Sequence, residues 1–208
     1  MRSPIDGRRT ARGLVQVLGL VGTSHLLDGL WRVAWPESAV ATTTALAEAA
    51  PAAPLARAGW LLVGILVAPI AEELAFRGGL MAVLRRVAGP AAAIGVSALA
   101  FGLVHAGPAH ALAATLLGLQ LGAMRHVHGL TLAIVAHVAN NALAFGLALG
   151  PGARAAGGLA GPQAIGALVL AAAASGIAWA MLAQALRSVP PPPSGPTGPL
   201  QPLRDVTE

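Results

Sequence analysis

Six long runs of apolar residues dominate the chain, and short turns or clusters of polar residues separate them. A helix needs about 20 apolar residues to cross the hydrocarbon core of a bilayer, so the two shortest runs are marginal. The pattern predicts an all-α fold, a polytopic transmembrane helix bundle of about six spans with a polar cavity inside the membrane. The predicted spans are residues 13–35, 57–81, 91–106, 109–124, 129–149 and 162–186.

The segments outside these runs indicate one membrane domain with polar ends. Residues 1–12 form a basic N-terminus, and residues 36–56 form an alanine-rich connector that we expect outside the cytoplasm. Residues 107–108, Gly-Pro, predict a tight turn, and residues 150–161 predict a glycine-rich one. Residues 189–208 are rich in proline and polar residues and cannot bury a core, so we expect a disordered tail there.

Composition narrows the class of protein. Hydrophobic residues make up 56% of the 208 residues and charged residues only 10%, whereas a soluble domain carries about 25% charged residues. The absence of cysteine excludes thiolate catalysis and thiolate metal sites. The net charge is +5, but the arginines stand mainly at the ends of the apolar runs. This placement indicates membrane topology, with a lipid bilayer and not nucleic acid as the partner.

The arginines also predict the orientation of the chain. With six spans both termini lie on one side of the membrane, and nine of the thirteen arginines then lie on that side as well. Because positive charge is retained in the cytoplasm, we expect a multi-pass protein of the cell membrane with both termini cytoplasmic. The nine are Arg2, Arg8, Arg9, Arg12, Arg85, Arg86, Arg125, Arg187 and Arg204.

Three charged residues interrupt the second apolar run: Glu72, Glu73 and Arg77. A charged side chain at membrane depth costs about 2.5–3.5 kcal/mol or more, so we expect these to face a protected interior. On a helix Glu73 and Arg77 are i,i+4 neighbours and can pair, while Glu72 is rotated by about 100°. Two carboxylates in different environments are typical of an acid–base site. A salt-bridged packing contact is the alternative, but it leaves Glu72 unexplained.

Two further polar clusters lie in later runs. Phe101 and His105 share a helical face, and so do His137 and Asn141. An imidazole beside a carboxamide can stabilise the oxyanion of a tetrahedral intermediate. The alternatives are that His105 is an interfacial residue at the end of its helix, and that His137 and Asn141 are an interhelical hydrogen-bonding pair. We expect Asn140, on another face, to be structural.

Taken together, the three clusters form an ordered set of motifs on three different runs. Glu-Glu-x-x-x-Arg, Phe-x-x-x-His and His-x-x-x-Asn resemble the CPBP family of intramembrane proteases, the CAAX-protease and bacteriocin-processing group also called Abi. The resemblance is to type II CAAX prenyl endopeptidases and covers about residues 61–149, inside a transmembrane domain predicted over residues 13–188. All three motifs match without substitution. The resemblance implies an endopeptidase of a bacterial membrane that hydrolyses a peptide bond in a membrane-associated protein or peptide.

The resemblance also implies roles for individual residues. Glu72 would be the general base that activates water, aided by His105. His137 and Asn141 would stabilise the oxyanion. The remaining pair, Glu73 with Arg77, would shape the site and balance its charge.

The same family is often labelled metalloprotease, so a metal has to be considered. Glu72, His105 and His137 could supply one carboxylate and two imidazoles to a catalytic zinc. The chain lacks a His-Glu-x-x-His helix. The family resemblance fits a mechanism in which a glutamate activates water without a metal more closely than it fits a zinc mechanism. We therefore expect no cofactor and keep zinc as the alternative.

Other intramembrane proteases match the sequence less well. Leu27-Asp28-Gly29 resembles the second motif of site-2-type metalloproteases but stands alone, and Gly95-Val96-Ser97-Ala98 lacks the final glycine of a rhomboid serine motif. Two other functions stay open. One is a non-catalytic immunity or peptide-binding protein on the same scaffold, and the other is a proton-coupled transporter, because buried glutamate and histidine also build proton relays. The sequence does not identify the substrate or the oligomeric state.

The remaining histidines give weaker signals. His25 and Asp28 share a helical face and either line a cavity or pack against another helix. His110 could line the same cavity as His105, and we expect His126 and His128 at the membrane interface beside Arg125. If Glu72, His105 and His137 form one site, the helices must be offset, tilted or broken, because His105 lies near the opposite end of its predicted span.

Overall fold

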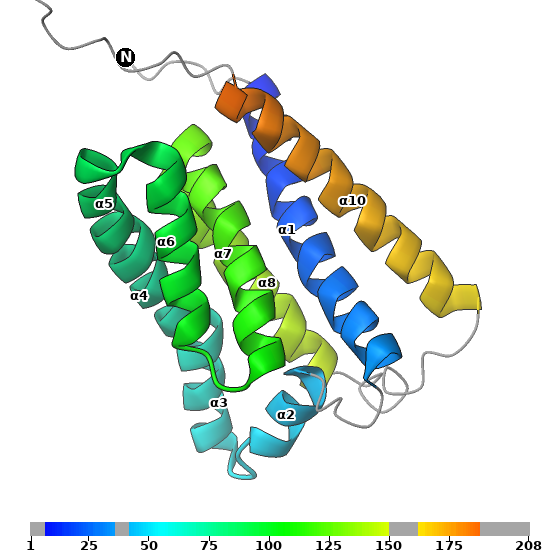
Figure 1. Ribbon diagram of the computed structural model, residues 1–208. Coiled ribbons are helices and arrows are strands. Elements are labelled where there is room, and N and C mark those ends of the chain that lie inside the picture. Colours follow the sequence, from blue (N-terminus) through cyan, green and yellow to red (C-terminus); the bar gives the residue numbers. More distant parts are fainter. Residues whose placement is uncertain (1–6, 36–41, 150–161, 188–208) are drawn as a thin grey trace, which may run out of the picture.

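The computed structural model describes residues 7–35, 42–149 and 162–187, and all regular structure within these ranges is helical (Figure 1). The all-α helix bundle is thereby confirmed. Helical elements lie on all six predicted runs. They are α1 (Gly7–Ala34), the continuous series α3 (Pro54–Leu62), η1 (Val63–Val67), α4 (Ala68–Glu73), η2 (Leu74–Leu80) and α5 (Met81–Val87), then α6 (Gly89–Leu103), α7 (Pro108–His128), α8 (Leu130–Leu149) and α10 (Pro162–Arg187).

Four of the described helical segments are long and apolar enough to cross a membrane: Thr10–Ala34, Pro54–Val87, Leu130–Leu149 and Ile165–Arg187. The helix α6 is apolar but has only 15 residues. At about 1.5 Å per residue it is shorter than the ~30 Å hydrocarbon core. The count of six spans therefore stays a prediction.

The connections differ in part from the prediction. The segment expected as a connector contains a helix, α2 (Thr42–Ala49), and the next helix already begins at Pro54. The tight turn after α6 is confirmed: Gly107 has φ +82°, a left-handed conformation that favours glycine, and Pro108 begins α7. The predicted glycine-rich turn at residues 150–161 and the predicted tail at 189–208 lie outside the described residues.

Small residues allow the helices to pack closely. In Figure 1, α1 and α10 run side by side, next to the group formed by α3–α8. A side chain at Gly19 or Gly22 of α1 would collide with Ala178 or with the backbone of Ala171 in α10. Close approach of this kind stabilises helix pairs in membranes, where the hydrophobic effect does not drive association. The glycine and alanine content thus has a packing role at this interface.

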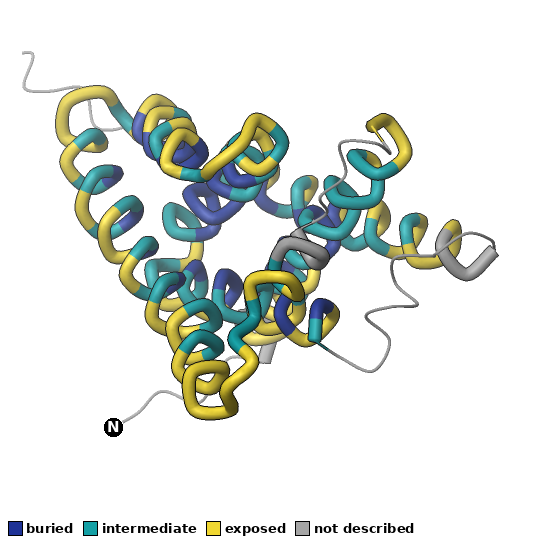
Figure 2. Tube along the Cα trace, turned by 90° about the horizontal axis from the view of Figure 1, so that it is seen from below, coloured by how far each residue is buried: buried dark blue, intermediate teal, exposed yellow. Residues whose placement is uncertain are grey.

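The buried core lies where α1, α7, α8 and α10 meet, and it includes Leu20, Leu121, Met124, Ala133 and Leu182. Figure 2 shows buried residues on the inward faces of the helices and exposed residues on the outer faces. Many of those exposed residues are large and apolar, for example on α3, α5 and α10. An exposed apolar surface of this extent is expected where lipid, and not water, surrounds the helices.

Buried hydroxyl and amide groups join three of these helices. Thr23 of α1 lies 2.9 Å from Gln120 Oε1 of α7 and 2.7 Å from the Ser175 hydroxyl of α10. Interhelical hydrogen bonds of this kind contribute about 0.6 kcal/mol each in a membrane protein. They join the α1–α10 pair to α7, the helix that packs against α6 and α8.

Candidate active site

Two π-helical segments interrupt the helix that carries the two glutamates. The segment η1 precedes Pro69 and η2 follows Glu73, which leaves α4 as a piece of six residues between them. Proline has no N–H, and its ring crowds the carbonyl of the preceding turn, so a regular α-helix does not tolerate it in the interior. A π-helical turn is wider and accommodates it. The proline therefore explains why the predicted single helix is irregular beside the glutamates.

Pro69 also removes the backbone donor that the Gly64 carbonyl would otherwise have. In η1 the N–H of Ala68 bonds to Val63 O, five residues earlier. The equivalent donor for Gly64 O would be the N–H that proline lacks. Instead, Asn141 Nδ2 of α8 donates to Gly64 O at 3.0 Å. Asn141 thus ties α8 to the irregular turn, and the sequence did not predict this partner.

Glu73 is fully buried, and two side chains share one of its oxygens. Arg77 Nη1 donates to Glu73 Oε1 at 2.7 Å, which confirms the predicted i,i+4 pair. His137 Nδ1 of α8 lies 3.0 Å from the same oxygen. Arg77 Nη2 also donates to Gly118 O of α7 at 3.2 Å. This buried group therefore links the glutamate helix to both α7 and α8.

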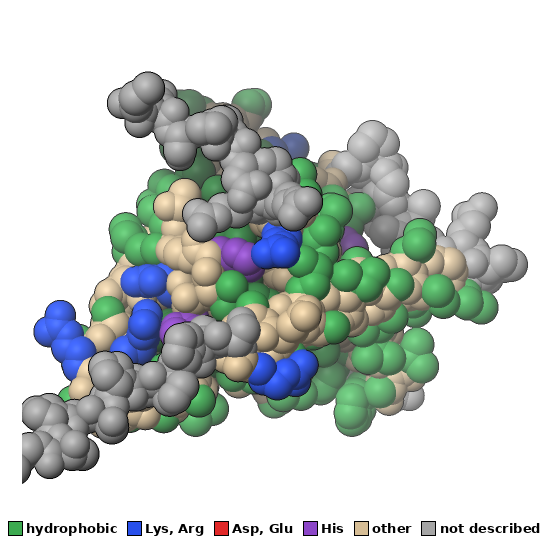
Figure 3. All heavy atoms as spheres, turned by 90° about the horizontal axis from the view of Figure 1, so that it is seen from above, with side chains coloured by type: hydrophobic (Ala, Val, Ile, Leu, Met, Phe, Trp, Pro, Cys, Tyr) green, Lys and Arg blue, Asp and Glu red, His purple; other side chains and the backbone are tan. Residues whose placement is uncertain are grey.

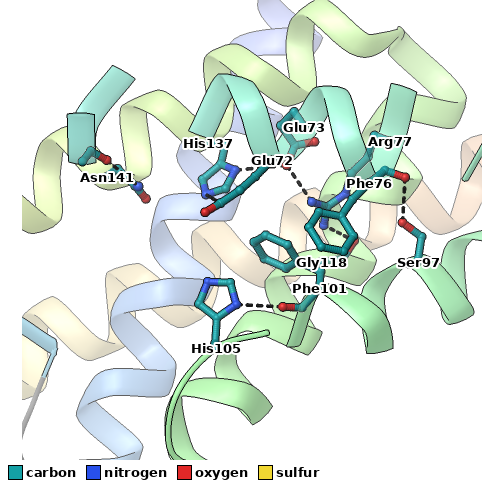
Figure 4. Close-up of polar contacts among 11 residues, drawn as sticks. Glu72, Glu73, Phe76, Arg77, Ser97, Phe101, His105, Gly118, His137 and Asn141 are labelled. Atoms are coloured by element: carbon teal, nitrogen blue, oxygen red, sulfur yellow. Dashed lines mark hydrogen bonds and ion pairs between the residues drawn. The ribbon is translucent and has the colours of Figure 1, made fainter. Parts of the chain in front are cut away.

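Glu72 is adjacent in sequence but lies in a different environment. Its side chain is 32% exposed, whereas that of Glu73 is 0% exposed. Glu72 Oε2 lies 3.6 Å from His137 Nε2, and Figure 4 shows the carboxylate beside that imidazole. One carboxylate is thus held by an arginine while the other is partly accessible, as the helical rotation between the two residues predicts.

Phe101 of α6 is the buried aromatic residue between the two histidines. Its ring centroid lies 4.7 Å from that of His105 and 5.7 Å from that of His137. The guanidinium carbon of Arg77 lies 4.3 Å from the same centroid. Figure 4 shows the ring of His105 and the carboxylate of Glu72 directed toward one another beside Phe101. His105 therefore joins the cluster through aromatic contacts, and within the described residues no hydrogen bond links it to Glu72.

The hydrogen bonds define which nitrogen of each histidine is available. His105 Nδ1 lies 2.7 Å from Phe101 O, and His137 Nδ1 lies 3.0 Å from the Glu73 carboxylate. A carbonyl or a carboxylate oxygen only accepts, so each Nδ1 carries the hydrogen. In both residues Nε2 is left for chemistry, as a base when the ring is neutral and as a donor when it is protonated.

The zinc alternative does not fit this geometry. Among the described residues no group of three or more His, Cys, Asp or Glu side chains lies close enough to hold a metal ion. Glu72 and His137 approach each other, but His105 reaches them only through Phe101. The described residues around Glu72 therefore do not fit a catalytic zinc.

Several other candidate residues from the sequence make structural contacts. Asp28 pairs with Arg32, with 3.0 Å between Oδ2 and Nε. The Ser97 hydroxyl, considered as a rhomboid-type nucleophile, donates to Phe76 O at 3.0 Å and is buried. His110 lies near the cluster, with its ring centroid 5.0 Å from that of His105. No motif in the sequence indicated Gly118, whose carbonyl accepts from the buried Arg77.

The part of the chain that carries the motifs matches a known protein family. Residues 54–143 match the family model described as type II CAAX prenyl endopeptidase Rce1-like, and the matched segment contains all three motifs. Comparisons with curated proteins and with solved structures gave no match. Four apolar helices of membrane-spanning length, together with this family, indicate a membrane protein. The family that the three motifs predict is confirmed for residues 54–143, which match the Rce1-like type II CAAX prenyl endopeptidases.

Proposed function

We propose that this protein is an intramembrane endopeptidase that hydrolyses a peptide bond in a membrane-associated protein or peptide, with Glu72 as the general base. The observation that carries the proposal is the contrast between the two glutamates. Glu73 is buried and paired with Arg77, while Glu72 is partly exposed and lies 3.6 Å from His137 Nε2. A pair of carboxylates whose environments differ in this way is typical of acid–base catalysis.

In the proposed reaction Glu72 takes a proton from a water molecule. The water oxygen attacks the carbonyl carbon of the substrate, and the carbonyl oxygen becomes an oxyanion. Glu72 then passes its proton to the leaving nitrogen as the carbon–nitrogen bond breaks. His105, through Nε2, helps to hold the water. Each step moves one proton or forms and breaks one bond, so no further reactant is needed.

His137 is the proposed donor to the oxyanion. Because its Nδ1–H is directed to Glu73, it donates from Nε2 only as an imidazolium.

Asn141 has a narrower role in this proposal than the family resemblance implies. One hydrogen of its amide is directed to Gly64 O, and its second N–H remains for the oxyanion. We propose that Asn141 mainly fixes the turn before Pro69, so that the glutamates and His137 keep their separation. We also propose that the chain crosses the membrane several times with both termini in the cytoplasm.

The test is cleavage of fluorogenic peptides by the full chain, purified in detergent. We expect Glu72→Gln to lower kcat by about 10²–10⁴-fold, the range that a general base contributes, with little change in the unfolding temperature. Glu48→Gln, on the exposed surface of α2, is the matched control and should cleave normally. Cleavage that persists in the Glu72→Gln, His105→Ala and His137→Ala variants would refute the proposed mechanism. A wild type that cuts no membrane-protein or peptide substrate would favour the non-catalytic alternative.

A further inference from the structure

Basic side chains gather at the end of the bundle where α5 and α7 finish. Arg85 and Arg86 stand in the last turn of α5, and Arg125, His126 and His128 stand in the last turn of α7. Figure 3, which views this end of the molecule, shows arginine and histidine side chains close together and no acidic side chain among the described residues. We call these five residues the basic end.

Acidic residues lie elsewhere in the described part of the chain. Asp28 is near the opposite end of α1 and Glu48 is on α2, which Figure 1 shows at the far end of the bundle. The two remaining glutamates belong to the candidate active site. Within the described residues, no ion pair involves any member of the basic end. Its positive charge is therefore not balanced by these parts of the protein.

Two nitrogen atoms of the basic end are buried without a hydrogen-bond partner among the described residues: Arg125 Nε and His126 Nδ1. Arg125 Nε carries a hydrogen, and a buried donor left unpaired costs about 1–3 kcal/mol. Burial lowers the pKa of His126, and the nearby Arg85 and Arg125 lower it further. The same repulsion makes the place favourable for an anion that accepts hydrogen bonds.

Helix electrostatics explain part of this arrangement but not all of it. Cations in the last turn of α7 complement the negative end of the helix dipole. This effect accounts for their position in the sequence. The same effect applies to Arg85 and Arg86 in the last turn of α5, but it does not account for the unpaired Nε of Arg125.

We propose that the basic end binds the phosphate group of an anionic phospholipid. It lies where apolar helices finish, the level at which phospholipid headgroups meet a spanning bundle. On α5 the exposed side chains of Val83 and Val87 lie one turn or less from the arginines and can contact acyl chains. Arginine presents several N–H donors to one phosphate, and Arg125 Nε is unpaired and suited to that use. This site is separate from the candidate active site and does not depend on peptidase activity.

The experiment measures thermal unfolding of the full chain in nanodiscs of phosphatidylcholine, alone and with increasing phosphatidylglycerol. We expect phosphatidylglycerol to raise the unfolding temperature. In Arg125→Gln and in Arg85→Gln the apparent affinity for it should fall about fivefold per arginine, the effect of one basic residue at an anionic surface. Arg57→Gln is the matched control, because Arg57 is exposed and lies at the opposite end of the bundle.

A second arm adds inorganic phosphate to the protein in detergent without lipid. If phosphate stabilises the wild type but not Arg125→Gln or Arg85→Gln, the result supports recognition of a phosphate group, with a free anion as its source. Equal stabilisation of wild type, Arg125→Gln, Arg85→Gln and Arg57→Gln by phosphatidylglycerol would overturn the proposal, and so would the absence of stabilisation in both arms. If Arg125→Gln does not fold, the exposed Arg85→Gln variant still decides the result.

Discussion

The buried carboxylate of Glu73 gives the sharpest prediction about stability. We expect Glu73→Gln to destabilise the protein strongly, although glutamine has nearly the same shape. The substitution keeps an acceptor near Arg77 but removes its charge. Arg77 is 0% exposed, and Glu73 is the carboxylate with which it pairs. An uncompensated cation would remain inside the helix bundle.

The size of the effect follows from the burial of both partners. Removing one member of a buried ion pair costs about 3–5 kcal/mol, because the other charge stays desolvated. The bond from His137 Nδ1 also loses its anionic acceptor, which weakens it. Glu72, with a side chain 32% exposed, loses no such partner, so Glu72→Gln should leave stability nearly unchanged.

Thermal unfolding of both variants in the same detergent checks this contrast. The double variant Glu73→Gln with Arg77→Gln removes both charges, so it should be more stable than Glu73→Gln alone. Such a recovery identifies the buried charge, and not a change in packing, as the cause. An unfolding temperature of Glu73→Gln equal to that of the wild type would refute the reasoning, as would equal losses in Glu72→Gln and Glu73→Gln.

Two further predictions concern the irregular turn before Pro69. A methyl group at Gly64 would collide with the Phe145 ring, so Gly64→Ala should lower the free energy of unfolding by about 1–3 kcal/mol through overpacking. Thermal unfolding measures this loss, and the control is Gly146→Ala, where a methyl group meets nothing. Asn141→Ala leaves Gly64 O without its side-chain donor and should cost about 1–3 kcal/mol as well as lower cleavage; an unchanged unfolding temperature with lost kcat would instead support a purely catalytic Asn141.

Local signals explain why the helical architecture can be predicted. Apolar runs and the Gly107–Pro108 turn depend on residues close in sequence, and the helices follow them. The i,i+4 pair of Glu73 and Arg77 is local in the same way. The helix α2 was missed because its alanine-rich sequence lies between prolines, in a segment with no apolar run. The number of spans is harder, because α6 is shorter than the bilayer core.

The sequence alone does not specify the contacts between helices. The three motifs indicated that polar residues on different helices meet, but not that His137 contacts both glutamates. The partner of Asn141 became clear only with the π-helical turn, which frees a carbonyl on another helix. The buried contact of Thr23 with Gln120 had no sequence signal, since each residue is unremarkable in its own helix.

Each motif combines a residue that anchors a helix with a residue that presents a polar atom to the candidate site. In the first motif Glu73 is buried with Arg77, and Glu72 stays partly exposed. In the second, Phe101 packs between the rings of His105 and His137, and its carbonyl orients His105.

The third motif follows the same division, because Asn141 binds the turn before Pro69 and His137 faces the glutamates. His137 and Asn141 are four residues apart on one face of α8, so the anchor fixes the direction of the other residue. In the second motif α6 ends at Leu103, and the Phe101 carbonyl holds His105 in the turn that follows. Loss of cleavage in an anchor variant therefore does not identify a catalytic group by itself. The kcat of each variant has to be compared with its unfolding temperature, and a chemical role is supported only where kcat falls and stability does not.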